Sequence, residues 1–237
     1  MKDYYTEKLA AEQLKKCYEI ASPRVQQYLR AEVDFVLSNI RPGDLVLDLG
    51  CGYGRVIPQL ASRAGFVIGI DNSHPSLLSG KEFLQDVPNS LLLEMDAAHL
   101  AFLDDSFDVV ICIQNGISAF HAGQRRLIGE SVRVVKSGST VLFSTYSEKF
   151  WLHRLEWFER QAEAGLLGEI DYEKTGNGII VCKDGFKATT VSPEDFLGLT
   201  SRLNIETRLV EVDESSLFCE MRKPDRRREV LDETQEF

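Results

Sequence analysis

The segment Val46-Leu47-Asp48-Leu49-Gly50-Cys51-Gly52-Tyr53-Gly54 places an apolar run directly before three closely spaced glycines. The apolar run predicts a buried strand. Residues 55–64 predict an amphipathic helix, because Pro58 falls within its first turn, where the missing amide costs little. A glycine-rich turn between a strand and a helix is where an open α/β sheet binds its ligand, since glycine lets a ligand approach the backbone. We therefore expect a ligand site at this turn.

A dinucleotide is the obvious candidate for such a turn, but two residues argue against it. The dinucleotide fingerprint needs a third glycine at the position where this chain has Arg55. Asp48 adds a carboxylate beside the turn, which repels a pyrophosphate but suits a cofactor that carries an ammonium group and a sulfonium centre.

Two further apolar runs also end in an aspartate. The run 66–70 precedes Asp71, whose carboxylate can accept hydrogen bonds from both hydroxyls of a ribose. The run 91–95 precedes Asp96-Ala97, which can accept a hydrogen bond from an adenine amino group. Each aspartate taken singly also fits a helix or turn cap. Three successive strands that end in aspartate, however, align three carboxylates along one crevice.

Strand and helix patterns alternate along most of the chain. Apolar runs at 45–47, 66–70, 91–95, 107–113 and 140–146 are separated by helical patterns. This alternation predicts a largely parallel sheet with helices on both faces. In the last third we expect a helix at 149–164, a hairpin within 178–191, and two closing strands at 204–212 and 217–221. The short turn between the closing strands predicts an antiparallel last strand.

These motifs resemble those of the class I S-adenosylmethionine-dependent methyltransferases. The resemblance is carried by the segment 46–54, Gly69-Ile70-Asp71, Asp96-Ala97, Phe107-Asp108-Val109-Val110 and the helix-turn-strand at 127–144. It covers residues 42–146 strongly and the remainder in outline. It implies an α/β, Rossmann-like doubly wound sheet of seven strands, mostly parallel with an antiparallel last strand. It also implies S-adenosylmethionine as the cofactor.

The resemblance further implies where the matching residues lie around that cofactor. The backbone of residues 50–52 faces the methionine part, Asp71 holds the ribose, Asn72 flanks the nucleoside, and Gln114 lies near the sulfonium. Asp96 and Ala97 hold the adenine. With Asp48, the predicted cofactor-binding residues are Asp48, Gly50, Cys51, Gly52, Asp71, Asn72, Asp96, Ala97 and Gln114.

The segment 114–121 supplies the candidates for contact with the methyl acceptor. It lacks the Asn/Asp-Pro-Pro-aromatic motif of many DNA and protein amide methyltransferases. Its Asn-Gly-x-x-x-x-His pattern is similar to small-molecule N-methyltransferases of the glycine-methylating kind. His121 is suited to act as a general base, or it simply begins the next helix. Asn115 either orients the acceptor or serves as a turn residue before Gly116. We predict His121 and Asn115 as catalytic residues, and an N acceptor over an O acceptor.

The two ends of the chain are expected to select the acceptor. We predict a single domain over 1–222, with a helical cap at 1–41, a cofactor-binding half at 42–146, and a lid with closing strands at 147–222; a charged tail follows at 223–237. Aromatic residues at 150, 151, 157 and 158 crowd the predicted lid helix. Their spacing fits a packing stripe better than an aromatic cage for a cationic or flat substrate. The cap carries Tyr4, Tyr5 and Tyr18. Arg24 and Arg55 are candidates to pair with the cofactor's carboxylate.

Composition limits the possible partners and locations. The chain has 237 residues, of which 43% are hydrophobic, and 27 basic against 37 acidic side chains give a net charge of −10. This charge disfavours nucleic acid as a partner. No apolar run reaches the length of a membrane span, and the first residues do not read as a secretory signal, so we expect a cytoplasmic protein. Five scattered cysteines and four histidines show no metal-ligand spacing, so no metal site is expected.

Taken together, the sequence predicts transfer of a methyl group from S-adenosylmethionine to a small-molecule acceptor. Three other functions remain open at this point. The first is binding of the cofactor without catalysis, the second is methylation of a protein or an RNA, and the third is aminopropyl transfer from a decarboxylated cofactor. The last of these usually shows extra acidic residues where this chain has Gln114 and Asn115.

Overall fold

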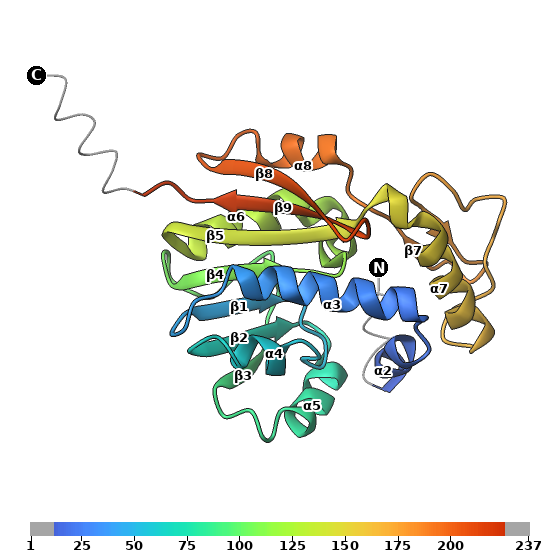
Figure 1. The fold of residues 1–237 in the computed structure, drawn as a ribbon, viewed down its shortest axis with the longest axis horizontal. Coiled ribbons are helices and arrows are strands. Elements are labelled where there is room, and N and C mark those ends of the chain that lie inside the picture. Colours follow the sequence, from blue (N-terminus) through green and yellow to red (C-terminus); the bar gives the residue numbers. More distant parts are fainter. Residues whose placement is uncertain (1–11, 226–237) are drawn as a thin grey trace, which may run out of the picture.

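Seven strands form one sheet in the order β3-β2-β1-β4-β5-β9-β8 (Figure 1). The computed structural model describes residues 12–225, apart from the side chains of His121 and Ala122. Neighbouring strands are parallel except where β9 pairs with β5 and with β8. The strands are β1 (Leu45–Leu49), β2 (Phe66–Asp71), β3 (Ser90–Glu94), β4 (Phe107–Cys112), β5 (Val135–Tyr146), β8 (Glu206–Val212) and β9 (Ser216–Arg222).

Helices cover both faces of this sheet, and a small hairpin lies outside it. The hairpin is formed by β6 (Ile180–Val181) and β7 (Lys187–Ala188). The α-helices are α2 (Glu12–Glu19), α3 (Pro23–Ser38), α4 (Ile57–Ala61), α5 (His74–Phe83), α6 (Gln124–Val134), α7 (Trp151–Glu163) and α8 (Pro193–Thr200), and the 3-10 helices are η1 (Gly116–Gly123) and η2 (Glu148–Phe150). None of these helices, within the described part of the chain, combines the length and apolar character needed to cross a membrane.

The alternating side chains of the strands build two cores, one on each face. Residues such as Val46, Val109 and Leu142 pack against α3 and α4. Their sequence neighbours Leu47, Val110 and Val141 point the other way, toward α6 and α8, because successive side chains of a strand alternate between faces. Burial on both faces explains why these strands read as continuous apolar runs rather than alternating ones.

The predicted architecture is confirmed. The doubly wound order, the sheet of seven strands and the antiparallel last strand all match the expectation, with β9 second from the edge. The strand order reverses between β1 and β4, and this reversal opens a crevice at the carboxyl ends of the parallel strands, where open α/β sheets bind ligands. In Figure 1, α2 and α7 lie at this same end of the sheet.

Two local predictions were wrong. The helix expected at 55–64 is reduced to α4, because the chain first turns through Gly52 and Gly54, whose φ angles are +57° and +79°. The strand expected at 140–146 is longer than predicted, since β5 already begins at Val135. The first part of β5 is irregular: Gly138 has a φ of +79°, and the pairing of β4 with β5 shifts register between Phe107 and Val109.

Candidate cofactor and acceptor site

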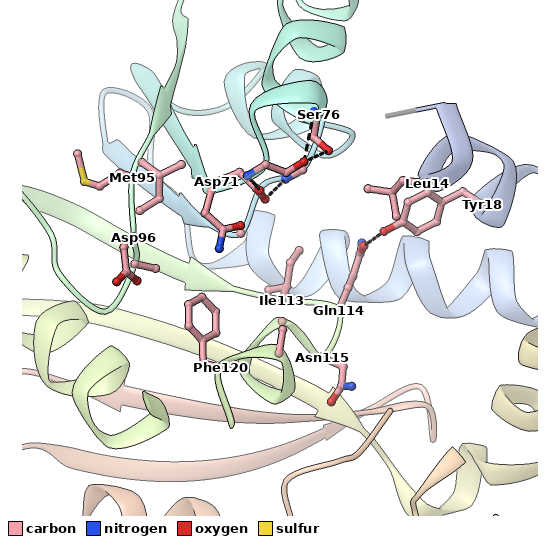
Figure 2. A pocket seen from close by; sticks show the side chains of 18 of the residues that line it. Leu14, Tyr18, Asp71, Ser76, Met95, Asp96, Ile113, Gln114, Asn115 and Phe120 are labelled. Atoms are coloured by element: carbon pink, nitrogen blue, oxygen red, sulfur yellow. Dashed lines mark hydrogen bonds between the residues drawn. The ribbon is translucent and has the colours of Figure 1, made fainter. Parts of the chain in front are cut away.

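A cavity of about 230 Å³, here called the main cavity, opens at the strand-order reversal. Its walls come from the loops after β1, β2, β3 and β4, and from α2, β5 and α7 (Figure 2). The lining residues are Leu14, Tyr18, Gly50, Gly52, Ile70, Asp71, Asn72, Ser73, Ser76, Met95, Asp96, Ala97, Ile113, Gln114, Asn115, Gly116, Ala119, Phe120, Tyr146 and Phe158.

Asp71 connects the end of β2 to the glycine turn. Its Oδ2 accepts a hydrogen bond of 2.8 Å from the Gly52 amide, and its Oδ1 accepts one of 2.7 Å from the Ser73 amide, where α5 begins. The amides of Gly50 and Cys51 donate to the carbonyl of Ile70 in the same region. One carboxylate therefore sets the position of the turn and of a helix N-terminus while lining the main cavity.

Asp96 lies further along the same cavity, at the end of β3. Its Oδ1 accepts a hydrogen bond from the Ala98 amide at 2.8 Å, and its Oδ2 lies 2.6 Å from Nδ1 of His99. These two contacts hold the carboxylate in its ionised form and lower its pKa, even though partial burial raises it. Asp96, like Asp71, therefore both caps the following turn or helix and lines the main cavity.

A second, smaller cavity of about 50 Å³, here called the side cavity, adjoins the glycine turn. Three of its lining residues carry buried polar atoms that have no hydrogen-bond partner: Oδ2 of Asp48, Nε and Nη2 of Arg55, and Nε2 of Gln114. Unpaired buried polar groups are costly, so such a cluster indicates a place built for a polar ligand.

The charges around the side cavity match a zwitterion. Asp48 can hold an ammonium group, while Arg55 and the Gln114 amide can hold a carboxylate. The methionine end of S-adenosylmethionine carries both groups. Burial, the larger cause, and the nearby Asp71 together raise the pKa of Asp48 to about 7, against the lowering effect of Arg55. A cationic ligand would draw this carboxyl into its charged form.

Of the two arginines considered for the cofactor's carboxylate, the structure brings only Arg55 to the cavities. Arg24 instead donates to Oδ2 and to the carbonyl oxygen of Asp213, at 2.7 Å each. The guanidinium of Arg55 lies over the Tyr18 ring, 4.4 Å from its centroid.

The turn after β4 has an unusual backbone. Gln114 and Asn115 are consecutive residues with φ angles of +55° and +61°, a conformation that non-glycine residues seldom adopt. The Asn115 side chain is engaged by its surroundings, since its Nδ2 donates to the Thr189 carbonyl and its Oδ1 accepts from the hydroxyls of Ser118 and Thr145. Asn115 lines the main cavity. The His121 side chain lies outside the described part of the structure.

Helix α2 covers both cavities. Leu14 lines each of them, and the hydroxyl of Tyr18 donates to Oε1 of Gln114 at 3.1 Å (Figure 2). The helix is held from the outside by α7, because Nε1 of Trp157 donates to the carbonyl of Cys17 at 2.8 Å. The residues of the predicted cap that precede α2, including Tyr4 and Tyr5, lie outside the described part of the chain.

The aromatic residues of α7 form a packing stripe rather than an open cage. Trp151 and Phe158 belong to one apolar cluster with the hairpin. The guanidinium of Arg154 lies 4.6 Å from the ring centroid of Tyr146, 5.6 Å from that of Phe158 and 5.9 Å from that of Trp151. The ring faces are thus already in contact with a cation that the protein itself supplies.

The structure brings the predicted cofactor residues together at one place. All nine of them line the main cavity, the side cavity or both. Sequence reasoning did not single out Leu14 or Phe120 among the residues that line the main cavity. Among residues 12–225, no group of three His, Cys, Asp or Glu side chains is arranged to hold a metal ion.

The fold is a Rossmann-like α/β sheet with a crevice at the carboxyl ends of its parallel strands. Residues 46–138 match a protein family described as "Methyltransferase domain". Among solved structures, a SAM-dependent methyltransferase from Methanosarcina mazei has the same fold, with a TM-score of 0.61 and 19% identity over 81% of this chain and 97% of that one. Residues 46–138 therefore carry a methyltransferase domain with a Rossmann-like fold, and S-adenosylmethionine is its cofactor.

Curated methyltransferases are similar to about half of this chain. The chain is 30% identical over 137 residues to 2-methyl-6-phytyl-1,4-hydroquinone methyltransferase of Synechocystis sp., covering 54% of this chain and 42% of that protein. It is 32% identical over 112 residues to demethylmenaquinone methyltransferase of Corynebacterium urealyticum, covering 46% of this chain and 44% of that protein. The aligned part is less than half of either relative.

Proposed function

We propose that this protein transfers a methyl group from S-adenosylmethionine to a small-molecule acceptor. The observation that carries the proposal is the side cavity, where buried and unpaired atoms of Asp48, Arg55 and Gln114 present one anion and two groups of donors. This arrangement complements the methionine zwitterion, and it continues into a cavity lined by Asp71 and Asp96, which suit a ribose and an adenine.

The cofactor supplies a methyl group on a sulfonium, which is an excellent leaving group. The acceptor atom forms a bond to the methyl carbon as the carbon–sulfur bond breaks, the electron pair passes to sulfur, and the acceptor loses a proton. The protein needs mainly to align the acceptor and to exclude water. Helix α2, held by Trp157, provides such a cover over the cavities.

A small acceptor fits the enclosure better than a macromolecule. The cavity beside Gln114 is bounded by Tyr18 of α2, Tyr146 of β5 and Phe158 of α7, which confine the space next to the cofactor site. The net charge of −10 disfavours a nucleic acid. The relatives named above are methyltransferases whose names specify quinone-type small molecules, which supports the same class.

Within this class we favour a nitrogen acceptor. Among the described residues that line the main cavity, the titratable side chains are Asp71, Asp96, Tyr18 and Tyr146, and none of them is a ready general base beside Gln114. A neutral amine needs no strong base to accept a methyl group. His121 remains our proposed base for an acceptor that must lose its proton first.

The test uses the purified chain with S-adenosylmethionine labelled in its methyl group. A cell extract is separated by ultrafiltration into small molecules and retained macromolecules, and each fraction is incubated with the wild-type protein and with Asp48→Asn. We expect S-adenosylhomocysteine release and labelled product only with wild-type protein and the small-molecule fraction. Label in retained material would assign a protein or RNA acceptor. Cofactor binding without turnover in either fraction would overturn the catalytic proposal.

The labelled product also tests the proposed acceptor atom and the two candidate catalytic residues. Mass spectrometry of the product distinguishes an N-methyl from an O-methyl group. His121→Ala and Asn115→Ala are then assayed with the identified acceptor, with folding checked by circular dichroism. If both folded variants turn over at the wild-type rate, neither residue acts on the acceptor.

A further inference from the structure

Glu32 is a buried carboxyl group that the proposed reaction does not use directly. It lies on α3, in line with the apolar residues Leu29, Val33 and Val36, and its side chain is fully buried. A carboxyl group is seldom buried unless it is hydrogen-bonded, because desolvation penalises its charged form. Its position therefore calls for a specific partner.

The partners of Glu32 lie on β5, on β9 and in the turn after β4, and of these Gln114 lines both cavities. Its Oε2 accepts a hydrogen bond of 3.0 Å from the backbone N–H of Gln114, and its Oε1 accepts one of 2.8 Å from the hydroxyl of Ser216 on β9. The hydroxyl of Ser144 on β5 also hydrogen-bonds to the Glu32 carboxylate. The same hydroxyl accepts a hydrogen bond of 2.8 Å from the backbone N–H of Gln114. One side chain thus connects α3, two strands and the turn after β4.

Gln114 is the residue that needs this support. Its backbone and that of Asn115 adopt left-handed conformations, which are strained in non-glycine residues. Its side chain lines both cavities, accepts from Tyr18 through Oε1, and leaves Nε2 buried and unpaired. A shift of this backbone would move Nε2 away from the place where the cofactor's methionine end is proposed to lie.

We propose that Glu32 is a positioning residue for this site: its ionised carboxylate holds the strained Gln114 backbone and thereby aims the Gln114 amide into the cofactor cavities. This inference rests on the proposed function, because only that function gives the Gln114 side chain a ligand, the methionine end of S-adenosylmethionine. A charged acceptor binds an amide about twice as strongly as a neutral one, so ionisation of Glu32 tightens the turn.

The ionisation of Glu32 falls in the range where it can be measured. Burial raises its pKa to about 7, against the lowering effect of hydrogen bonds from Ser144, Ser216 and Gln114 and of the nearby charge of Arg55. The other titratable groups that interact with it are Tyr18, Tyr28 on its own helix, and Cys112 on β4. Cofactor affinity is therefore expected to rise with pH as Glu32 loses its proton.

The experiment measures the dissociation constant of S-adenosylhomocysteine by calorimetry from about pH 5.5 to about pH 9. Ser216→Ala removes one hydrogen bond from the carboxylate at a position outside both cavities, which raises the pKa of Glu32 further. We expect the midpoint of the affinity rise to move upward by about 0.5 to 1 pH unit, with affinity at the highest pH unchanged. A purely structural effect would weaken binding at every pH.

Two further variants complete the test. Ser131→Ala removes an equally buried hydroxyl, which donates to the Leu127 carbonyl on α6, and it should leave the profile unchanged. Glu32→Gln, checked for folding by circular dichroism, should remove the step that Ser216→Ala moves and leave the separate rise in affinity that comes from Asp48. A Ser216→Ala profile that superimposes on that of a binding-competent wild type would overturn the role of Glu32. Wild-type protein that binds no S-adenosylhomocysteine at any pH would instead overturn the proposed function.

Discussion

The amide of Gly52 donates a hydrogen bond of 2.8 Å to Oδ2 of Asp71, across the gap between the first and second strands. The residue expected to hold the cofactor's ribose therefore also fixes the glycine turn that faces its methionine part. The two halves of the cofactor site are coupled through one side chain, so a change at Asp71 acts on both of them.

Asp71→Ala should weaken S-adenosylmethionine binding by about 1 to 3 kcal/mol, because hydrogen bonds to a charged group are lost and the Gly52 amide loses its acceptor. Asp71→Asn keeps one acceptor oxygen and should lose less. The matched control is Asp108→Asn, since Asp108 also accepts from a backbone amide, that of Leu45, but lies outside both cavities. Calorimetry that shows full affinity in folded Asp71→Ala would remove Asp71 from the cofactor site.

Ionisation of the buried Asp48 carboxyl group is expected to lower the stability of the folded protein. Its pKa of about 7 lies above the unfolded value, so the stability it contributes is fully present at low pH and is lost as pH rises through about 7. Asp48→Asn cannot ionise, and at about pH 8 it should be more stable than wild type by at least about 1.4 kcal/mol, the equivalent of one pKa unit. Urea denaturation at several pH values measures the difference in unfolding free energy between Asp48→Asn and wild type. If this difference is no larger at about pH 8 than at about pH 5, the prediction is wrong.

The same carboxyl group links cofactor binding to protons. If Asp48 binds an ammonium group as a carboxylate, S-adenosylmethionine binding near pH 7 should release protons and should strengthen as pH rises. Titrations in buffers with different ionisation enthalpies report the number of protons released. Asp48→Asn should reduce that number, and an unchanged number would mean that the protons come from another group.

Gly50 and Gly43 form a matched pair for testing the glycine turn. Their φ angles are +73° and +93°, and a Cβ atom added at either would meet no other atom within 4 Å. Alanine should therefore cost each about 1 kcal/mol of stability through backbone strain alone. Gly50 lines the cavities and Gly43 does not, so only Gly50→Ala should also lose cofactor affinity. Equal affinities in the two variants would show that the space above Gly50 is not used by the cofactor.

The hydrogen bond between Tyr18 and Gln114 provides a test of the cover formed by α2. Tyr18→Phe removes the bond of 3.1 Å and should weaken cofactor binding by about 0.5 to 1.5 kcal/mol. Tyr172→Phe is the control, because the hydroxyl of Tyr172 bonds to Glu159 on an exposed surface. If both substitutions leave the dissociation constant unchanged, α2 does not contribute to binding through this contact.

The cofactor half of the molecule was predictable because its signals are local. A strand that ends in Asp48, a glycine turn and a second strand that ends in Asp71 each occupy a few consecutive residues, and parallel strands bring such ends to one edge by geometry alone. The predicted residues line the two cavities, but the sequence did not indicate that the Asp71 carboxylate accepts a hydrogen bond from the glycine turn itself.

The contacts made by Glu32 and Tyr18 were not predictable in this way. Each joins the turn after β4 to a helix about 80 or more positions earlier in the chain, at Gln114 in both cases. One signal was available, since Glu32 interrupts an apolar helical stripe, and a charge in such a place indicates a buried partner. The partner could not be named, because loop conformations with positive φ outside glycine leave no clear mark in a sequence.

The bond from Trp157 to the backbone of Cys17 has a consequence for how such proteins diversify. In our proposal, α7 and α2 bound the space for the acceptor, while the loops of the central strands hold most of the cofactor and α2 reaches the cofactor through Tyr18. Substitutions in the two outer helices can alter which molecules are accepted without touching Asp48, Asp71 or Asp96. Because the helices are joined to each other, however, a change in one that shifts this bond must be matched by a change in the other, so new acceptor preferences are expected to arise through paired substitutions.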